Sequence, residues 1–171
     1  MFEIEAKVRL TEADFKRLKV EIPKFAKLVK SVTNKDSYYN YGMKDFSMRI
    51  RKQNGNGILN LKSKKRGEGI ESNREIELSL NSEPAFDKFL KQIGFPLTAK
   101  KEKISEIYKA GKMQIELNHV KKLGFFLEIE TIANLKSEIP SAKKALRELF
   151  GKLGFSPRDF EKKYYLELLG K

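Results

Sequence analysis

The sequence contains no cysteine, which excludes disulfide bonds and thiolate metal sites. It also has no apolar run approaching the roughly 18 residues that a membrane-spanning helix requires. The first residues, from Met1 to Lys7, carry charges where a signal peptide needs an apolar stretch. From these absences we expect a soluble cytoplasmic protein without a membrane partner.

Acidic residues are outnumbered by basic ones. The chain of 171 residues has 36 Lys and Arg against 23 Asp and Glu, for a formal net charge of +13. This excess attracts anions such as phosphates, nucleic acids or acidic lipids, but it does not distinguish among them. A hydrophobic content of 40% suits a globular protein with a stable core. Since no linker or low-complexity segment interrupts the chain, we expect a single domain over residues 1–171.

Alternation of polar and apolar residues is the main secondary-structure signal in the chain. The strands predicted from it cover residues 2–10, 29–41, 47–53, 58–65, 72–80, 100–109, 112–120 and 125–132. Asn54-Gly55 predicts a tight hairpin between two of these strands, because both turn positions accept a positive φ. Capping and proline signals predict helices over residues 11–22, 84–94, 141–153 and 157–169.

Nearly every predicted strand has one ionic side, and carboxylates and cations fall mostly on different strands. The same-side sets are Glu3, Glu5 and Lys7; Arg49 and Arg51; Lys62 and Lys64; Glu75 and Glu77; Lys101 and Lys103; Glu116 and Asn118; Glu128 and Glu130. The solvent-facing side of an open sheet accounts for any one of these strands. Their recurrence instead favours an α+β fold, a closed or nearly closed antiparallel eight-stranded β-barrel with flanking helices and a polar inner face.

Carboxylates and cations on one inner face match the chemistry of a metal-bound triphosphate. Carboxylate oxygens ligate Mg²⁺ or Mn²⁺, and Arg and Lys neutralise phosphate oxygens. A groove that binds only nucleic acid would have no use for seven inward carboxylates, so a nucleic acid is the less favoured partner. The pattern therefore favours a nucleoside or inorganic triphosphate as the ligand.

Several short motifs follow one another in a recognisable order. They are Glu3-Ile4-Glu5-Ala6-Lys7, Met48-Arg49-Ile50-Arg51, Leu59-Asn60-Leu61-Lys62, Arg74-Glu75-Ile76-Glu77, Gly124-Phe125-Phe126-Leu127-Glu128-Ile129-Glu130 and the ending Tyr165-Leu166-Glu167-Leu168-Leu169. Together they resemble the CYTH superfamily of triphosphate tunnel metalloenzymes, which includes class IV adenylyl cyclases, thiamine triphosphatases and tripolyphosphatases. Asp36-Ser37-Tyr38-Tyr39 and Asp45-Phe46 resemble the class IV cyclase branch.

This resemblance implies an enzyme that converts ATP to cyclic AMP and pyrophosphate, or one that hydrolyses a triphosphate such as inorganic or thiamine triphosphate. It implies Mg²⁺ or Mn²⁺ ligands at Glu3, Glu5, Glu128, Glu130 and Asn118. The phosphates and their cations would be bound by Lys7, Arg49, Arg51, Lys62, Lys103, Glu75, Glu77 and Glu116. The catalytic set would be Glu3, Glu5, Lys7 and Glu128, in a monomer or homodimer.

Some positions depart from the family pattern. Ser105 stands where the pattern has a phosphate-binding Arg, Asn118 stands where it has an Asp, and Arg74 is displaced by one residue. An Asn side chain offers an oxygen but no charge. These departures keep open a non-catalytic phosphate or polyphosphate binder.

The net charge also keeps open a basic RNA-binding protein, with Lys64-Lys65-Arg66 and Lys121-Lys122 as its patch. His119, the only histidine, falls on the side of its strand opposite to Asn118. We therefore interpret His119 as structural and expect it to point away from the inner face.

Overall fold

The computed structural model describes residues 1–40, 46–63, 66–67 and 69–170. Tyr41, Asp45, Lys64 and Lys65, which the sequence interpretation used, lie outside the described residues. Among the helices within those ranges, each is too short or too polar to cross a membrane.

The described residues form an antiparallel sheet with helices on its outer surface, which confirms the predicted α+β class. The strands are β1 (Phe2–Leu10), β2 (Lys27–Tyr39), β3 (Phe46–Gln53), β4 (Asn56–Ser63), β5 (Arg66–Gly67), β6 (Ile70–Asn73), β7 (Glu75–Leu80), β8 (Leu97–Ala110), β9 (Met113–Val120) and β10 (Gly124–Ala133). The α-helices are α1 (Glu12–Glu21), α2 (Glu83–Gln92), α3 (Ile139–Lys152) and α4 (Tyr165–Leu168). Single 3₁₀ turns occupy Ile22–Lys24, Lys136–Glu138 and Pro157–Asp159.

The strand count differs from the predicted eight because residues 66–80 contribute three short strands within the described part of the chain. The predicted hairpin is confirmed: β3 and β4 pair directly, and Asn54 and Gly55 adopt φ values of 49° and 86°. Both values lie in the left-handed region that this turn requires.

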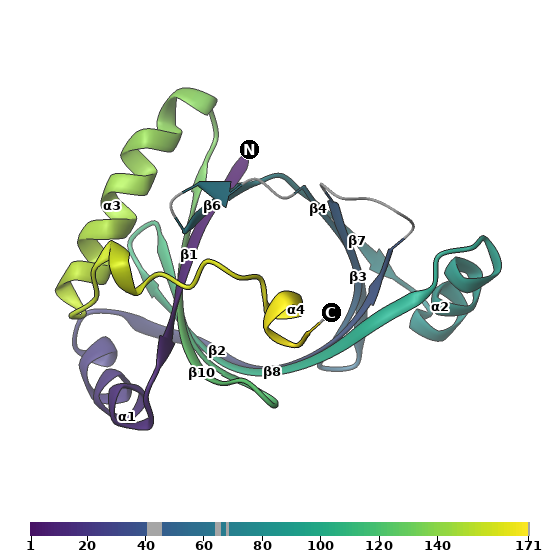
Figure 1. Ribbon diagram of the computed structural model, residues 1–171, viewed down its shortest axis with the longest axis horizontal. Helices are drawn as coiled ribbons and strands as arrows, with labels where there is room; N and C mark the ends of the chain where they lie inside the picture. Colours follow the sequence, from purple (N-terminus) through teal and green to yellow (C-terminus); the bar gives the residue numbers. More distant parts are fainter. Residues whose placement is uncertain (41–45, 64–65, 68, 171) are drawn as a thin grey trace.

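The sheet rolls up so that its two ends are joined by the main chain itself (Figure 1). Its strand order is β5-β6-β1-β10-β9-β8-β2-β3-β4-β7. β6 and β7 lie near opposite ends of this order, yet only Arg74 separates them in sequence. The Arg74 amide donates to Ser63 Oγ, and the Ser63 amide donates to the Arg74 carbonyl, both at 2.9 Å. The predicted near-closure therefore rests on this crossing, since no strand ladder in the described residues joins β6 to β7.

Apolar side chains point outward from the rolled sheet, because the helices cover its outer surface. α1 and α3 lie against the outer face of β1, β9 and β10, where Ile4, Leu127 and Phe150 have no exposed surface. α2 covers β3 and β4 through a second apolar cluster around Leu90. With the apolar residues used outside, the alternation along each strand leaves the charged residues on the inside.

The predicted helix over residues 157–169 is wrong. One 3₁₀ turn begins at Pro157, residues 160–164 are not helical, and α4 covers only Tyr165–Leu168. Tertiary contacts override the helical signal: Phe160 bridges to Val8, and the Glu161 amide donates to the Lys7 carbonyl at 2.8 Å. β6 pairs with β1 only over Glu3–Ala6, so this C-terminal segment takes up the part of β1 that β6 leaves open.

Candidate active site

The inner faces of the strands enclose a cavity of about 430 Å³. Small-molecule sites in proteins commonly measure about 300–1,000 Å³. All of the predicted site residues except Asn118 line this cavity: Glu3, Glu5, Lys7, Arg49, Arg51, Lys62, Glu75, Glu77, Lys103, Glu116, Glu128 and Glu130. The structure therefore brings together side chains from strands that are far apart in sequence.

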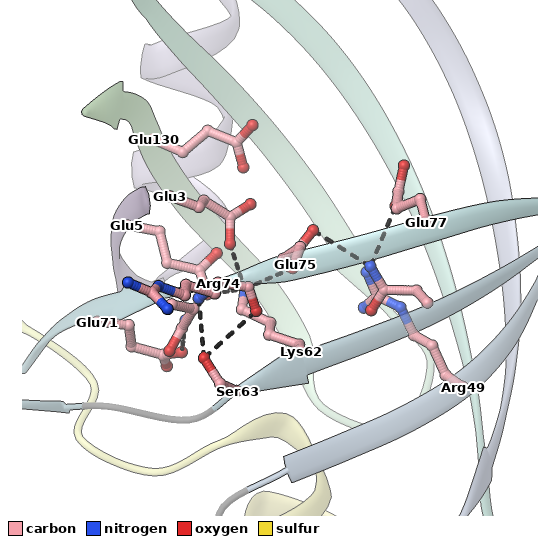
Figure 2. A network of polar contacts seen from close by, with 12 residues as sticks. Glu3, Glu5, Arg49, Lys62, Ser63, Glu71, Arg74, Glu75, Glu77 and Glu130 are labelled. Carbon is pink, nitrogen blue, oxygen red and sulfur yellow. Dashed lines mark hydrogen bonds and ion pairs between the residues drawn. The ribbon is translucent and has the colours of Figure 1, made fainter. Parts of the chain in front are cut away.

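One wall of the cavity is a group of carboxylates around a single ammonium (Figure 2). Lys62 Nζ lies 2.5 Å from Glu3 Oε2, 2.5 Å from Glu5 Oε1 and 3.2 Å from Glu75 Oε1. Lys62 and Glu75 face each other on the paired strands β4 and β7. Glu3 and Glu5 come from β1, which does not pair with β4, so the closure of the sheet at Arg74 creates this contact.

Three carboxylates of this wall are spaced to hold a divalent cation. Oxygens of Glu3, Glu5 and Glu130 all lie within 4.8 Å of one another, and Figure 2 shows the Glu130 side chain beside Glu3. Burial, together with the carboxylates of Glu116 and Glu5, raises the pKa of Glu130 to about 8. Burial and Glu5 also raise the pKa of Glu3. Negative charge is therefore under-compensated here, and an all-carboxylate oxygen set fits Mg²⁺ or Mn²⁺.

Glu5 differs from its neighbours in its titration. Burial would raise its pKa, but Lys62 outweighs this effect and lowers the pKa of Glu5 to about 2. At neutral pH Glu5 is therefore ionised. Glu130 keeps its proton in most molecules until the pH approaches its pKa of about 8.

A second ion cluster lies on β8, β9 and β10. Glu116 and Glu128 face each other across paired strands, where like charges repel. Lys103 Nζ bridges them, at 2.7 Å from Glu116 Oε2 and 2.9 Å from Glu128 Oε2. Burial opposes ionisation of Glu128, but Lys103 outweighs it and lowers the pKa of Glu128. The structure thus places Glu128 with Lys103 and outside the group of Glu3, Glu5 and Glu130.

The opposite wall is a group of cations around one carboxylate. Asp36 Oδ1 accepts a hydrogen bond from Arg51 Nε at 2.8 Å, and Asp36 Oδ2 lies 3.2 Å from Lys101 Nζ and 3.9 Å from Arg49 Nη1. Burial would raise the pKa of Asp36, but Lys101, Arg49 and Arg51 hold it well below its usual range. Arg49 Nε has no hydrogen-bond partner among the described residues. The Arg49 guanidinium therefore has donor capacity left for an anion.

Several side chains that line the cavity had no predicted role: Asn60, Glu71, Lys101, Gln114, Tyr164 and Tyr165. Asp36 had none either, although it contacts the lining residues Arg51 and Lys101. The alternation already placed Lys101 on the ionic side of its strand with Lys103, and Asp36 faces Lys101 on the paired strand, so both could have been included in the predicted site. Glu71 and Tyr164 carried no such signal, because their segments were predicted to begin later or to be helical.

The C-terminal residues enter the rolled sheet, as the position of α4 in Figure 1 illustrates. The Tyr165 ring lies 4.8 Å from Lys101 Nζ and 5.3 Å from Lys7 Nζ. Lys7 Nζ also pairs with Glu71 at 3.6 Å. Burial, with the charge of Glu128 beside it, raises the pKa of Tyr165, so its hydroxyl stays protonated.

Ser105 and Asn118, two of the residues that depart from the family pattern, are neighbours in the structure. They face each other on β8 and β9, and neither has any exposed surface. Ser105 Oγ and both polar side-chain atoms of Asn118 lack hydrogen-bond partners among the described residues. Asn118 does not line the cavity, and its ligand role stays a prediction. His119 is exposed and packs on Phe125 with ring centroids 5.0 Å apart, as its parity predicted.

Comparison with known sequences agrees with this geometry. A family model described as the CYTH domain matches residues 1–165. A protein of Methanocaldococcus jannaschii named "Putative adenylate cyclase MJ0240" is 28% identical over 176 residues, covering 99% of each chain.

Solved structures share the fold. The PH1012 protein of Pyrococcus horikoshii aligns with a TM-score of 0.86 and 28% identity over 97% of this chain and 98% of that one. HpAC1 from Hippeastrum, described as having a dominant triphosphatase activity, aligns with a TM-score of 0.67 and 18% identity over 98% and 95%. The motifs, the inward-facing charges and the match over nearly the whole length agree, and this chain belongs to the CYTH domain family.

Proposed function

We propose that the protein is a metal-dependent enzyme that acts on a triphosphate, either by cyclising ATP or by hydrolysing the triphosphate. The observation that carries this proposal is the division of one cavity into two walls of opposite charge. Glu3, Glu5 and Glu130 belong to the acidic wall, and Arg49 and Arg51 belong to the basic one. A polyanion with its divalent cation needs both walls, whereas a free nucleic acid needs only the second.

In this proposal Glu3, Glu5 and Glu130 hold Mg²⁺ or Mn²⁺. When bound, the ion supplies positive charge that polarises a phosphoryl oxygen and orients the phosphates. Glu128 remains with Lys103, so its part is to fix that ammonium rather than to ligate the ion.

The cationic residues position the phosphates and neutralise their charge. Phosphoryl transfer depends mainly on positioning and charge neutralisation and needs no side-chain nucleophile. Arg49 presents a guanidinium with free donor capacity, and Arg51 is held in place by two hydrogen bonds to Asp36. Buried guanidinium and ammonium groups need no reorganisation when negative charge develops on the phosphates.

The two reactions differ in the attacking group. In cyclisation the ribose 3′-hydroxyl attacks the α-phosphate of ATP, and pyrophosphate leaves. In hydrolysis water attacks the terminal phosphate, the bond to the next phosphate breaks, and the diphosphate leaves while the attacked group is released as inorganic phosphate. The cyclase name of the archaeal relative supports the first reaction, and the activity described for HpAC1 supports the second.

A substrate panel tests the proposal. The protein is incubated with ATP, thiamine triphosphate or tripolyphosphate, each with Mg²⁺ or Mn²⁺, and cyclic AMP, pyrophosphate and phosphate are measured. Glu5→Gln should reduce turnover by at least about 100-fold, the scale of one preorganised electrostatic contact. Glu102→Gln is the matched control, because Glu102 pairs with Lys121 on the outer side of β8 and should leave turnover unchanged. Absence of turnover with every substrate would refute the enzymatic proposal.

A second candidate is a non-catalytic polyphosphate binder, favoured by the neutral Ser105 and Asn118 pair at positions where the family pattern has charges. This candidate predicts that calorimetry detects binding of tripolyphosphate while no product forms in the same sample. Arg49→Gln should then weaken binding, and this measurement separates a binder from an inactive protein with no ligand.

A further inference from the structure

Lys62 occupies an unusual position for a phosphate-binding residue. Its ammonium is surrounded by Glu3, Glu5 and Glu75, and only 14% of its side chain is exposed. The ammonium is therefore already paired with three carboxylates before any phosphate binds.

The carboxylates that hold Lys62 are also those spaced for the metal ion. Glu3 and Glu5 contact Lys62 at 2.5 Å, and the same two residues form the group of three with Glu130. Two cations that are bound to the same carboxylate oxygens repel each other strongly inside a poorly solvated cavity. A divalent ion and the Lys62 ammonium therefore compete for Glu3 and Glu5.

We propose that Lys62 is a built-in counter-ion of the metal site, which metal binding displaces from Glu3 and Glu5 toward the triphosphate. This inference rests on the proposed function. Glu75 stays opposite Lys62 on the paired strand and anchors the displaced side chain. A phosphate oxygen then replaces the carboxylate oxygens that the ammonium has lost.

The exchange makes Lys62 a specificity determinant. The metal ion alone binds weakly, because it leaves the buried ammonium with too few acceptors. Triphosphate alone also binds weakly, because Lys62 remains engaged by carboxylates. The metal–triphosphate complex satisfies both groups and is therefore the species that this site selects.

Binding of Mn²⁺ alone tests the inference without any measurement of activity. Free Mn²⁺ is followed by electron paramagnetic resonance in titrations of wild type, Lys62→Gln and Lys101→Gln. Lys62→Gln should bind Mn²⁺ about tenfold more tightly or better, the size of a typical coupling between two binding events. Lys101→Gln is the matched control: it removes one ammonium from the same cavity, but that ammonium contacts Asp36. Its Mn²⁺ affinity should change by less than about threefold, since the charge lies outside the metal group.

The outcomes separate the two proposals. If wild type binds Mn²⁺ and Lys62→Gln binds it no more tightly, the counter-ion inference is overturned while the proposed function stands. If Lys62→Gln does not bind Mn²⁺ either, the counter-ion inference is overturned, whereas the proposed function is refuted by absence of turnover in the substrate panel. If Lys62→Gln does not fold, a second measurement is used. It follows the NH₃⁺ resonance of Lys62 in ¹⁵N-lysine-labelled wild type, which is assigned by comparison with Lys62→Arg. That resonance should shift on addition of Mg²⁺, and an unchanged resonance would contradict the displacement.

Discussion

The acidic and basic walls of the cavity are built in the same way with the charges exchanged. On the acidic wall three carboxylates, of Glu3, Glu5 and Glu75, surround one ammonium. On the basic wall three cations, of Arg49, Arg51 and Lys101, surround the carboxylate of Asp36. In each group the central charge reduces the repulsion but does not cancel it. Each wall therefore keeps an excess of its own sign and is suited to a different part of a metal–triphosphate complex.

The walls differ in what holds them in place. The basic wall lies on neighbouring strands, since β2 pairs with both β3 and β8. The acidic wall joins two pairs of strands, β1 with β10 and β4 with β7, which do not pair with each other and meet because the chain crosses at Arg74. The basic wall is therefore set by hydrogen-bonded register, whereas the contacts of Lys62 with Glu3 and Glu5 also depend on the closure of the sheet.

The largest expected effect comes from removing the centre of the basic wall. Asp36→Asn leaves Arg49, Arg51 and Lys101 without their shared carboxylate, and losing one partner of a buried ion pair costs about 3–5 kcal/mol. Urea unfolding measures this change. Glu83→Gln breaks the more exposed pair with Lys52 and should cost less than about 1 kcal/mol. A similar small loss in both variants would show that Asp36 is not the centre of its wall.

The next test uses the neutral pair of Ser105 and Asn118 on β8 and β9, because a charge can be introduced there outside both charged walls. Asn118→Asp places a carboxylate opposite Ser105 in a fully buried position and should destabilise the protein by about 3 kcal/mol. The double variant Ser105→Arg with Asn118→Asp should recover at least about 1 kcal/mol through the cross-strand pair. A double-mutant cycle in urea measures the coupling, and strictly additive losses would contradict it.

The smallest effect is a pH dependence on the acidic wall. The pKa of Glu130 in the folded protein is about 8, above its ordinary value of about 4.3. The folded state therefore binds this proton more tightly, and the contribution of Glu130 to stability falls as the pH rises from about 4.3 to 8. Glu130→Gln cannot ionise, so without metal it should lose less stability than wild type over this range. Glu5 and Glu128, whose pKa values are lowered, titrate at lower pH and do not mask the difference.

Thermal unfolding in EDTA between pH 5 and 9 measures this difference. Between pH 5 and 9 the Tm of Glu130→Gln should fall by at least a few degrees less than that of wild type, since about 1 kcal/mol shifts the Tm of a chain this long by 2–4 °C. Equal slopes of Tm against pH for the two proteins would mean that the negative charge on this wall is already compensated.

The sequence by itself determined which side chains face inward. A strand has a period of two, so Glu3, Glu5 and Lys7 had to share one face of β1 in any fold that used this strand. The hairpin at Asn54 and Gly55 was equally local, because those two residues accept the positive φ that the turn needs.

Only the tertiary structure decided which inward side chains meet. Lys62 reaches Glu3 and Glu5 through the crossing at Arg74, and Ser105 faces Asn118 through the register of β8 and β9. The C-terminal segment gave a helical signal, yet pairing with the open part of β1 placed Tyr165 in the cavity instead. Local patterns specify the direction of a side chain, whereas contacts between distant strands depend on register and closure, which the burial of the whole core selects.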